Sequence, residues 1–371
     1  MKILITGAKG FIGKNLVAEL RNRKADEVLE FDRDNSLAEL EQFTKDCDIV
    51  FHLAGVNRPL NEKEFEEGNR DFTNTLLSCL KKYGNRAPVI FSSSVQAKLD
   101  NPYGRSKLAA ENTLIKYSEE TGIPVTIYRL PNVFGKWCRP SYNSVVATFC
   151  HNIAHDLPIQ INDPGTVLNP IYIDDVVNEF ISKSENIVNN TGPEVIEEIK
   201  PVYTLTLGSL ASLIRSFREN RSGLGVPDLA DPFTRKLYAT YLSYLPEKEF
   251  SYPLKMNIDQ RGSFTEFIRT NDRGQVSVNN SKPGIVKGNH WHHTKNEKFL
   301  VVSGTGVIRF RKIGTSEVIE YHVSGEKLEV VDIPTGYTHN IENLGITDMV
   351  TIMWASEVFD PEKPDTFFEV V

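Results

Sequence analysis

Residues 1–13 read MKILITGAKGFIG, and this stretch decides the fold of the first part of the chain. The β-branched run Lys2–Thr6 predicts a strand, and Gly7, Gly10 and Gly13 form a GxxGxxG turn directly after it. Glycines at such a turn let backbone N–H groups approach a pyrophosphate at the positive end of the next helix. A tight connection between a strand and a helix uses the same residues, so the turn alone leaves both interpretations open.

A second predicted strand, Val28–Phe31, ends in Asp32 and Arg33, about 20 residues after the glycine turn. An acidic side chain at that place binds a ribose hydroxyl, whereas an arginine accommodates a 2′-phosphate. The presence of both residues leaves NAD and NADP open, and Arg33 favours NADP.

The first part of the chain alternates short strand-like runs with helical stretches. The further strand-like runs are Ile49–Leu53, Val89–Ser92 and Val125–Leu130. Such alternation is typical of βαβ units, and it predicts a doubly wound parallel sheet of the Rossmann type.

From Gln275 onward the pattern changes to short strands that are separated by Gly, Pro, Asn and Asp. These strands are expected at Phe299–Val302, Val307–Phe310, Val318–His322 and Thr351–Trp354. The spacing predicts an all-β barrel. Pro246 follows the last helical pattern, so we expect one domain in residues 1–246 and another in residues 247–371.

Composition excludes several classes of protein. The 371 residues carry a net charge of −7 without a basic block, so nucleic acid is not an expected partner. No run of about 18 apolar residues predicts a membrane span, and the immediate first strand argues against a signal peptide. We therefore expect a cytoplasmic protein. The four cysteines form no CxxC pair, which disfavours a thiolate metal site.

Tyr103 and Lys107 stand four residues apart and share one face of a predicted helix. Asn101 as N-cap and Pro102 as first residue predict its start, and Gly122 predicts its end. A neighbouring ammonium group is expected to depress the pKa of the tyrosine.

A serine run, Ser92–Ser94, ends the strand before this helix. A serine hydroxyl can hold a substrate oxygen while a tyrosine donates a proton to it.

These pieces together resemble the extended short-chain dehydrogenase/reductases that act on nucleotide sugars. The resemblance covers roughly the first 245 residues and is carried by motifs in the family's order. The motifs are Thr6–Gly13, Phe51–Gly55, Asn69, Ser92–Ser94, Tyr103 with Lys107, Arg129–Gly135 and Pro170–Val176.

The resemblance implies roles for individual residues. Ser94, with Ser93 as second choice, would be catalytic together with Tyr103 and Lys107. The sugar nucleotide would contact Asn69 and Asn132. The nicotinamide cofactor would lie against Gly7, Gly10, Phe11, Ile12, Gly13, Asp32, Arg33, Leu53, Ala54, Tyr103 and Lys107. One departure from the family is that only eight residues separate Ser94 from Tyr103.

Sugar dehydratases of this family carry an acidic pair next to the catalytic hydroxyl. Here Val95 and Gln96 follow Ser94, and neither can act as an acid or a base. Dehydration is therefore disfavoured, and hydride transfer at a keto or hydroxyl carbon remains.

A possible metal-ligand set lies in the second part of the chain. His290 and His292 are two apart in a predicted strand and can face one metal, with Glu297 arriving from the next strand. His339 supplies a further imidazole after the turn at Pro334–Tyr337. This ligand set suits Zn, Fe, Mn or Ni.

This region resembles the cupin family. Its spacing from Gly284 to Gly304 matches the first cupin motif, and Pro334–Asn343 matches the second, with Leu328 in place of a glycine. The resemblance implies a metal-binding barrel that uses His290, His292, Glu297 and His339, with Zn as the expected metal. Tyr337 is a candidate acid or base, while His293 and His322 are expected at the surface and at a strand end. Some cupins bind no metal, and this alternative stays open.

Residues 259–266 resemble the DxRGxFxE opening of cupin-fold epimerases that act on nucleotide keto-sugars. A metal that polarises a keto-sugar's carbonyl makes the adjacent proton easier to remove. Return of the proton to the opposite face inverts that carbon, and a reductase can then convert the carbonyl to a hydroxyl. We therefore expect an epimerase and a reductase in series.

The whole arrangement resembles the two-domain capsular polysaccharide enzymes of the UDP-N-acetyl-L-fucosamine pathway. The resemblance implies that the cupin domain epimerises carbon 3 of a UDP-2-acetamido-2,6-dideoxy-4-keto-hexose. NADPH-dependent reduction at carbon 4 would then give UDP-2-acetamido-2,6-dideoxy-L-talose. A homodimer is also expected from the resemblance. The alternatives are a redox-neutral NAD-dependent sugar 4-epimerase with a non-catalytic cupin, and a cupin that only dimerises or senses sugar.

Overall fold

The computed structural model describes residues 1–24, 27–59, 61–187, 192–196, 198–270 and 272–371. It divides into two compact units. The first comprises Met1–Arg215 and Ala230–Pro246, and the second comprises Ser216–Leu229 and Glu247–Val371. The segment Ser216–Leu229 thus belongs to the second unit, whereas the boundary predicted at Pro246 places it in the first domain.

The first unit is built on a six-stranded sheet with the order β2-β1-β3-β4-β5-β9, and all of its pairings are parallel. Its strands are β1 (Lys2–Thr6), β2 (Glu27–Phe31), β3 (Ile49–His52), β4 (Val89–Ser94), β5 (Val125–Leu130) and β9 (Pro193–Ile196). The predicted Rossmann-type sheet is confirmed.

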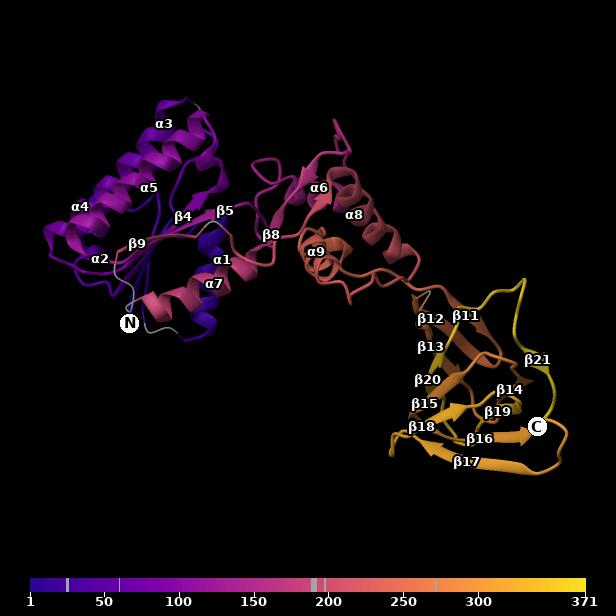
Figure 1. The fold of residues 1–371 in the computed structure, drawn as a ribbon. Helices are drawn as coiled ribbons and strands as arrows, with labels where there is room; N and C mark the ends of the chain where they lie inside the picture. Colours follow the sequence, from indigo (N-terminus) through magenta and orange to yellow (C-terminus); the bar gives the residue numbers. More distant parts are fainter. Residues whose placement is uncertain (25–26, 60, 188–191, 197, 271) are drawn as a thin grey trace. The chain divides into compact units, whose positions relative to one another are not determined.

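Helices cover both faces of this sheet (Figure 1). One face packs against α1 (Phe11–Asn22) and α7 (Ile173–Asn186), and the other packs against α2 (Leu37–Thr44), α4 (Phe72–Lys82) and α5 (Pro102–Thr121). Alternation along β1 explains the two layers, because Ile3 and Ile5 join the first core and Leu4 joins the second.

The sheet order reverses between β1 and β3, and ligands of such folds bind at this switch point. Gly7 follows β1 with φ +72°, and a Cβ atom there would lie 2.7 Å from the backbone nitrogen of Ala54 after β3. A Cβ atom on Gly13 would lie 2.2 Å from the carbonyl oxygen of Gly7. These two positions require glycine, since the contacts are with backbone atoms.

Further elements complete the first unit. The helical ones are α3 (Lys63–Phe65), a π-helix (Glu66–Asp71), a 3₁₀ turn (Val95–Lys98), α6 (Val145–Ala154), α9 (Pro232–Leu242) and the first half of α8 (Leu207–Ser222). The short strands are β6 (Asn132–Phe134), β7 (Val167–Leu168), β8 (Pro170–Tyr172) and β10 (Leu205–Thr206). No helix in the described part of the chain is both long and apolar enough to cross a membrane.

The second unit consists of two antiparallel sheets, which confirms the predicted all-β domain (Figure 1). One sheet contains β11 (Met256–Asp259), β12 (Gly262–Thr270), β13 (Gly274–Ser281), β20 (Met349–Ala355), β15 (Glu297–Ser303) and β18 (Val330–Ile333), in that order. The other contains β17 (Val318–Ser324), β16 (Thr305–Lys312), β19 (Tyr337–Asn343), β14 (Val286–Trp291) and β21 (Phe367–Phe368).

The buried interior of the second unit has an apolar and a polar part. Phe299, Ile308, Phe310 and Ile341 belong to its hydrophobic core. Strand β13 instead buries a row of polar side chains, namely Gln275, Ser277, Asn279 and Ser281. Buried polar groups are costly without partners, and Asn279 here donates to the hydroxyl of Ser281 at 3.1 Å and accepts from the ammonium group of Lys287 at 2.7 Å.

The segment Ser216–Leu229 is attached to the second unit by polar contacts. Arg218 forms an ion pair with Glu249 at 2.8 Å. The backbone N–H of Arg269 in β12 donates to the carbonyl oxygen of Leu224 at 2.8 Å. These contacts explain why the segment groups with the second unit, which we call the β domain, even though it precedes Pro246 in sequence.

Candidate active sites

The glycine turn and the end of β2 form one side of the first site. The carboxylate of Asp32 accepts hydrogen bonds from the backbone N–H groups of Lys9 at 2.7 Å and Arg33 at 2.8 Å. These bonds hold the carboxylate beside the turn. Arg33 is exposed at the same place, so the structure brings both predicted ribose-side residues to the cofactor turn.

The segment after β3 forms the opposite side of the site. Leu53 and Ala54 are half-buried, and the N–H of Leu53 donates to the carbonyl oxygen of Thr6 at 3.0 Å. His52 is fully buried between the hydroxyls of Thr6 and Thr73, and burial lowers its pKa to about 3. A neutral imidazole therefore ties β1 and β3 to helix α4.

Asn69 lies in the π-helix and is almost fully buried. Its amide group donates to the carbonyl oxygen of Val56 at 3.0 Å and to the hydroxyl of Ser106 at 2.8 Å, and it accepts from the N–H of Val56 at 2.9 Å. Both amide hydrogens thus have partners within the protein. This geometry gives Asn69 a positioning place beside the Gly55 segment and does not support its predicted contact with substrate.

A short turn explains how Ser94 reaches Tyr103 across so few residues. Val95–Lys98 forms a 3₁₀ turn, and Ser94 and Tyr103 are hydrogen-bonded through their side chains. Gly104 makes this possible, because a Cβ atom there would lie 2.3 Å from the carbonyl oxygen of Gln96. The side chain of the N-cap Asn101 accepts from the N–H of Gly104 at 2.8 Å, so the predicted start of α5 is confirmed.

Ser93 points away from this site. Its hydroxyl donates to the fully buried carboxylate of Glu111 at 2.5 Å, and Arg129 forms an ion pair with that carboxylate at 2.6 Å. Successive residues in a strand face opposite sides of the sheet, so engagement of Ser93 on one side leaves Ser94 on the other. The geometry favours Ser94 over Ser93 as the residue that faces a substrate.

Lys107 is buried, and its ammonium group donates to the carbonyl oxygen of Ser92 at 2.8 Å. Burial lowers the pKa of Lys107 to about 8, while the charge of Glu111 acts in the opposite direction. Burial also raises the pKa of Tyr103, and its hydrogen bond with Ser94 opposes this rise only in part. The expectation that the ammonium group depresses the pKa of Tyr103 is therefore wrong, because burial dominates.

The remaining predicted residues of the first site lie at the start of α1 and in β6. Phe11 and Ile12 begin α1 and pack partly against the core. Asn132 is exposed in β6, which pairs with β8.

The second site lies in the β domain. Strand β14 carries His290, with His292 just beyond its end, Glu297 begins β15, and His339 lies in β19. One potential ligand atom from each of these residues lies within 4.8 Å of all the others, so the set could hold a metal ion. The predicted ligands are thus brought together from three strands.

Within this cluster, the ring nitrogens of two histidines face the carboxylate of Glu297. Nε2 of His292 and Nε2 of His339 each lie 3.3 Å from Oε2 of Glu297. Burial disfavours the charge of Glu297, yet the two imidazoles lower its pKa overall. Burial lowers the pKa of His290 to about 4.

The state of His339 shows that the cluster fits a metal. Its ring is almost fully buried, and apart from the Glu297 carboxylate, whose Oε2 lies 3.3 Å from Nε2, its ring nitrogens have no hydrogen-bond partner within the described residues. Nδ1 of His292 contacts the carbonyl oxygen of Asp365 at 2.5 Å, and this oxygen can only accept, so the lone pair of a neutral ring lies on Nε2. Three imidazoles and one carboxylate form a ligand set that suits a divalent metal such as Zn, Fe, Mn or Ni.

The other candidate residues of the second site differ in how far they are exposed to solvent. Tyr337 is half-buried and packs against the barrel core, two residues before His339 on the same strand. His293 is exposed, as expected, whereas His322 is exposed within β17 and not at the expected strand end.

Family models divide the chain in the same way as the sequence motifs. Residues 3–197 match the NAD dependent epimerase/dehydratase family, and residues 257–367 match the polysaccharide biosynthesis C-terminal domain. The chain belongs to the NAD dependent epimerase/dehydratase family, and its cofactor is a nicotinamide nucleotide.

Relatives of full length define the family more narrowly. A UDP-2-acetamido-2,6-beta-L-arabino-hexul-4-ose reductase from Pseudomonas aeruginosa is 46% identical over 99% of this chain and 98% of its own length. The crystal structure of the capsular polysaccharide assembling protein CapF from Staphylococcus aureus is 53% identical and has a TM-score of 0.93 over 100% of both chains. The chain is a member of this two-domain capsular polysaccharide family, which confirms the resemblance drawn from the motifs.

A more distant structure shows the fold of the first unit alone. The UDP-glucose 4-epimerase of Thermus thermophilus, in complex with NAD, is 21% identical and has a TM-score of 0.51. The match covers 59% of this chain and 84% of that one.

Two residues of these sites, Glu111 and Asp365, are not predicted from the sequence. Glu111 stands four residues after Lys107 on α5, and this spacing could have indicated a shared helix face. Asp365 is distant in sequence from His292, and no local pattern connects them.

We expect the ammonium group of Lys107 to titrate near pH 8, because burial lowers its pKa to about 8. The Glu111 carboxylate raises this pKa, so Glu111→Gln should move the titration to lower pH. The unfolded chain keeps the proton to higher pH, so the contribution of Lys107 to stability increases as the pH rises above 8. The carbon-13 NMR shift of the lysine ε-carbon measures the titration, with Lys107→Arg as the assignment control. Titration at the ordinary lysine pKa would contradict this expectation.

Proposed function

We propose that this chain is a bifunctional nucleotide-sugar enzyme for capsular polysaccharide synthesis. The β domain epimerises carbon 3 of a UDP-2-acetamido-2,6-dideoxy-4-keto-hexose with a bound metal. The first unit then reduces the keto group with NADPH to give UDP-2-acetamido-2,6-dideoxy-L-talose. The relative from Pseudomonas aeruginosa, which is named a reductase of a UDP-linked keto-sugar, supports this substrate class.

The observation that carries the proposal is the convergence of four ligand atoms within 4.8 Å inside the β domain. A reductase that only transferred hydride would have no use for this cluster. The first unit separately contains a hydroxyl pair, Ser94 with Tyr103, beside a buried lysine. Two different chemistries therefore have two separate sets of residues in one chain.

In the β domain, His290, His292, Glu297 and His339 would hold the metal, with zinc as the expected ion. The metal would polarise the carbonyl oxygen of the keto-sugar and so acidify the neighbouring C–H bond. A side chain of the barrel must then remove the proton and return one to the other face. Tyr337 is our candidate for this step, because it lies two residues from His339 on the same strand.

In the first unit, NADPH would supply the hydride for the keto carbon. The hydroxyl of Ser94 holds the carbonyl oxygen, and Tyr103 donates the proton that completes the new hydroxyl. The raised pKa of Tyr103 keeps this residue protonated and able to donate. Arg33 beside the cofactor turn favours the 2′-phosphate of NADPH over NAD.

The chemistry itself fixes the order of the two reactions. The proton next to the carbonyl is acidic only while the keto group is present. Reduction removes that group and so ends any further inversion of the neighbouring carbon. Epimerisation must therefore come first, and reduction traps the inverted isomer.

We expect His290→Ala to abolish exchange of solvent deuterium into the keto-sugar, because the metal loses one of its four ligands. NADPH binding should remain, since this cofactor binds the first unit. Mass spectrometry of the substrate and fluorescence titration of NADPH measure the two properties. His322→Ala, which changes an exposed histidine of the same domain, is the control and should exchange normally. Exchange that survives removal of the metal by a chelator would contradict the proposal.

We expect substitution of Ser94 to affect the reaction rate and substitution of Ser93 to affect mainly the stability of the protein. Ser94→Ala should lower the rate of NADPH oxidation by about 100-fold or more, because the substrate oxygen loses a hydrogen bond. Ser93→Ala should preserve the rate within a few-fold but lower the free energy of unfolding by about 1 to 3 kcal/mol, because Glu111 loses a buried donor. Steady-state kinetics and chemical unfolding measure these effects. A large rate loss in Ser93→Ala alone would reverse the assignment.

A redox-neutral sugar 4-epimerase with a non-catalytic cupin is the second candidate. Matches to the NAD dependent epimerase/dehydratase model favour it as an alternative. We expect one NADPH to be consumed for each keto-sugar converted, because our proposal ends in a net reduction. Absorbance at the reduced-nicotinamide band and product quantification give this ratio. Conversion without consumption of NADPH would favour the epimerase instead.

A further inference from the structure

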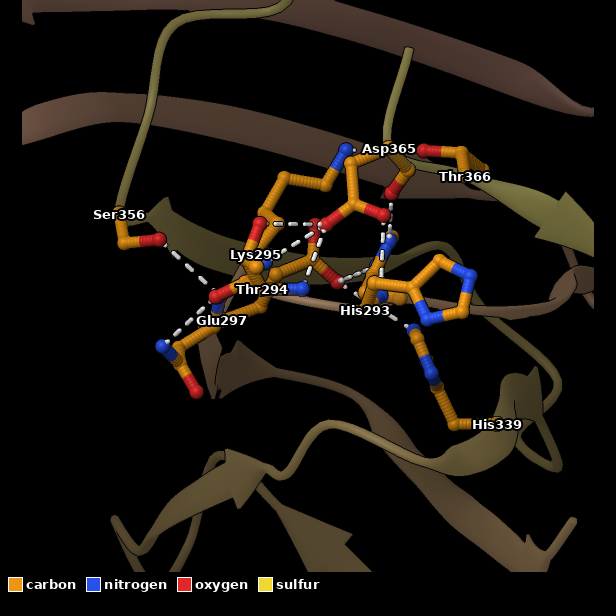
Figure 2. Close-up of polar contacts among 10 residues, drawn as sticks. His293, Thr294, Lys295, Glu297, His339, Ser356, Asp365 and Thr366 are labelled. Atoms are coloured by element: carbon orange, nitrogen blue, oxygen red, sulfur yellow. Dashed lines mark hydrogen bonds and ion pairs between the residues drawn. The ribbon is translucent and has the colours of Figure 1, made fainter.

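A segment that is distant in sequence lies against the turn that carries two of the metal-ligand candidates (Figure 2). We call residues 365–369 the clamp segment. Its first residue, Asp365, accepts a hydrogen bond from Nδ1 of His292 through its backbone carbonyl oxygen at 2.5 Å. This contact fixes the orientation of the imidazole and directs Nε2 toward Glu297.

The side chain of Asp365 holds the same turn by a second set of contacts. Its Oδ1 accepts from the backbone N–H of His293 at 2.9 Å. Its Oδ2 accepts from the N–H groups of Thr294 at 2.7 Å and Lys295 at 2.9 Å, and from the Thr294 hydroxyl at 2.9 Å. A single carboxylate therefore fixes all three residues that follow His292.

A buried lysine attaches the turn to the clamp segment once more. Lys295 is only 6% exposed, and its ammonium group donates to the hydroxyl of Thr366 at 2.8 Å. A buried ammonium group without a partner is costly, so loss of this contact is disfavoured. The contact therefore further limits movement of the turn between His292 and Glu297.

The clamp segment also reaches the strands of the other two ligands. The N–H of Glu369 donates to the carbonyl oxygen of Asn289 at 3.0 Å, next to His290. The carbonyl oxygen of Glu369 accepts from the hydroxyl of Thr338, next to His339. Residues adjacent to three ligands, and His292 itself, are thus hydrogen-bonded to one five-residue stretch.

We propose that Asp365 is a positioning residue of the metal centre, and that the clamp segment holds the histidine ligands in the geometry that binds a divalent cation. This inference rests on the metal site of the proposed function and adds the residues that orient its ligands. Hydrogen-bond partners of ligating histidines contribute about 10- to 100-fold to metal affinity in other proteins.

The test is Zn²⁺ binding by the full chain, measured by competition with a chromophoric chelator. Asp365→Ala should bind Zn²⁺ at least tenfold more weakly than the wild type, and Asp365→Asn should lie between them because it keeps one acceptor. Asp360→Asn is the matched control, since Asp360 is an exposed carboxylate nearby that accepts only from the N–H of Glu362 among the described contacts. This control should bind Zn²⁺ as the wild type does.

A second measurement separates positioning from a general loss of stability. The visible absorption spectrum of the Co²⁺ form should change in Asp365→Asn, because ligand orientation changes the field around the ion. Thermal melting of the metal-free proteins shows whether each variant is folded, and if Asp365→Ala is not, Asp365→Asn decides the question. Equal Zn²⁺ affinity and equal Co²⁺ spectra in wild type and variant would overturn the inference. Failure of the wild type to bind Zn²⁺ would instead refute the metal site of the proposed function.

Discussion

A buried carboxylate oxygen and an imidazole nitrogen repel one another through their lone pairs unless a proton or a metal cation lies between them. This constraint governs the β domain, where the carboxylate of Glu297 lies 3.3 Å from a ring nitrogen of each of two histidines. The barrel holds these atoms together by its strand register and by hydrogen bonds from outside the cluster. The contacts of Asp365 with His292 and with the turn that follows it supply several of these hydrogen bonds.

In the first unit, the fold places the hydroxyl of Ser94 beside Tyr103 and directs the hydroxyl of Ser93 away from it. The alternation of a strand sends Ser93 to Glu111 and Ser94 to Tyr103. A short 3₁₀ turn and the missing side chain of Gly104 then bring α5 close to the end of β4. This local backbone geometry allows Ser94 and Tyr103 to form a hydrogen bond although fewer residues separate them than is usual in the family.

The two proposed chemistries belong together because each depends on the same carbonyl group. Inversion requires the group, and reduction destroys it. An enzyme that carries both activities can convert a reversible inversion into a product that no longer exchanges. In the proposed function, one carbonyl group thus connects the metal-ligand cluster of the β domain with the Ser94–Tyr103 pair of the first unit.

The sequence by itself determined much of this protein. The periodicity predicted the strands β1 and β5 at their observed bounds, and the capping residues Asn101 and Gly122 predicted α5, because these signals are local. Histidine and glutamate spacing likewise predicted the metal-ligand set. Only the tertiary structure engaged Ser93 with Glu111 and Ser94 with Tyr103, placed Asn69 inside the protein, raised the pKa of Tyr103 and brought Asp365 to His292. Burial and contacts between distant residues control these features, and neither is written in the spacing of neighbouring residues.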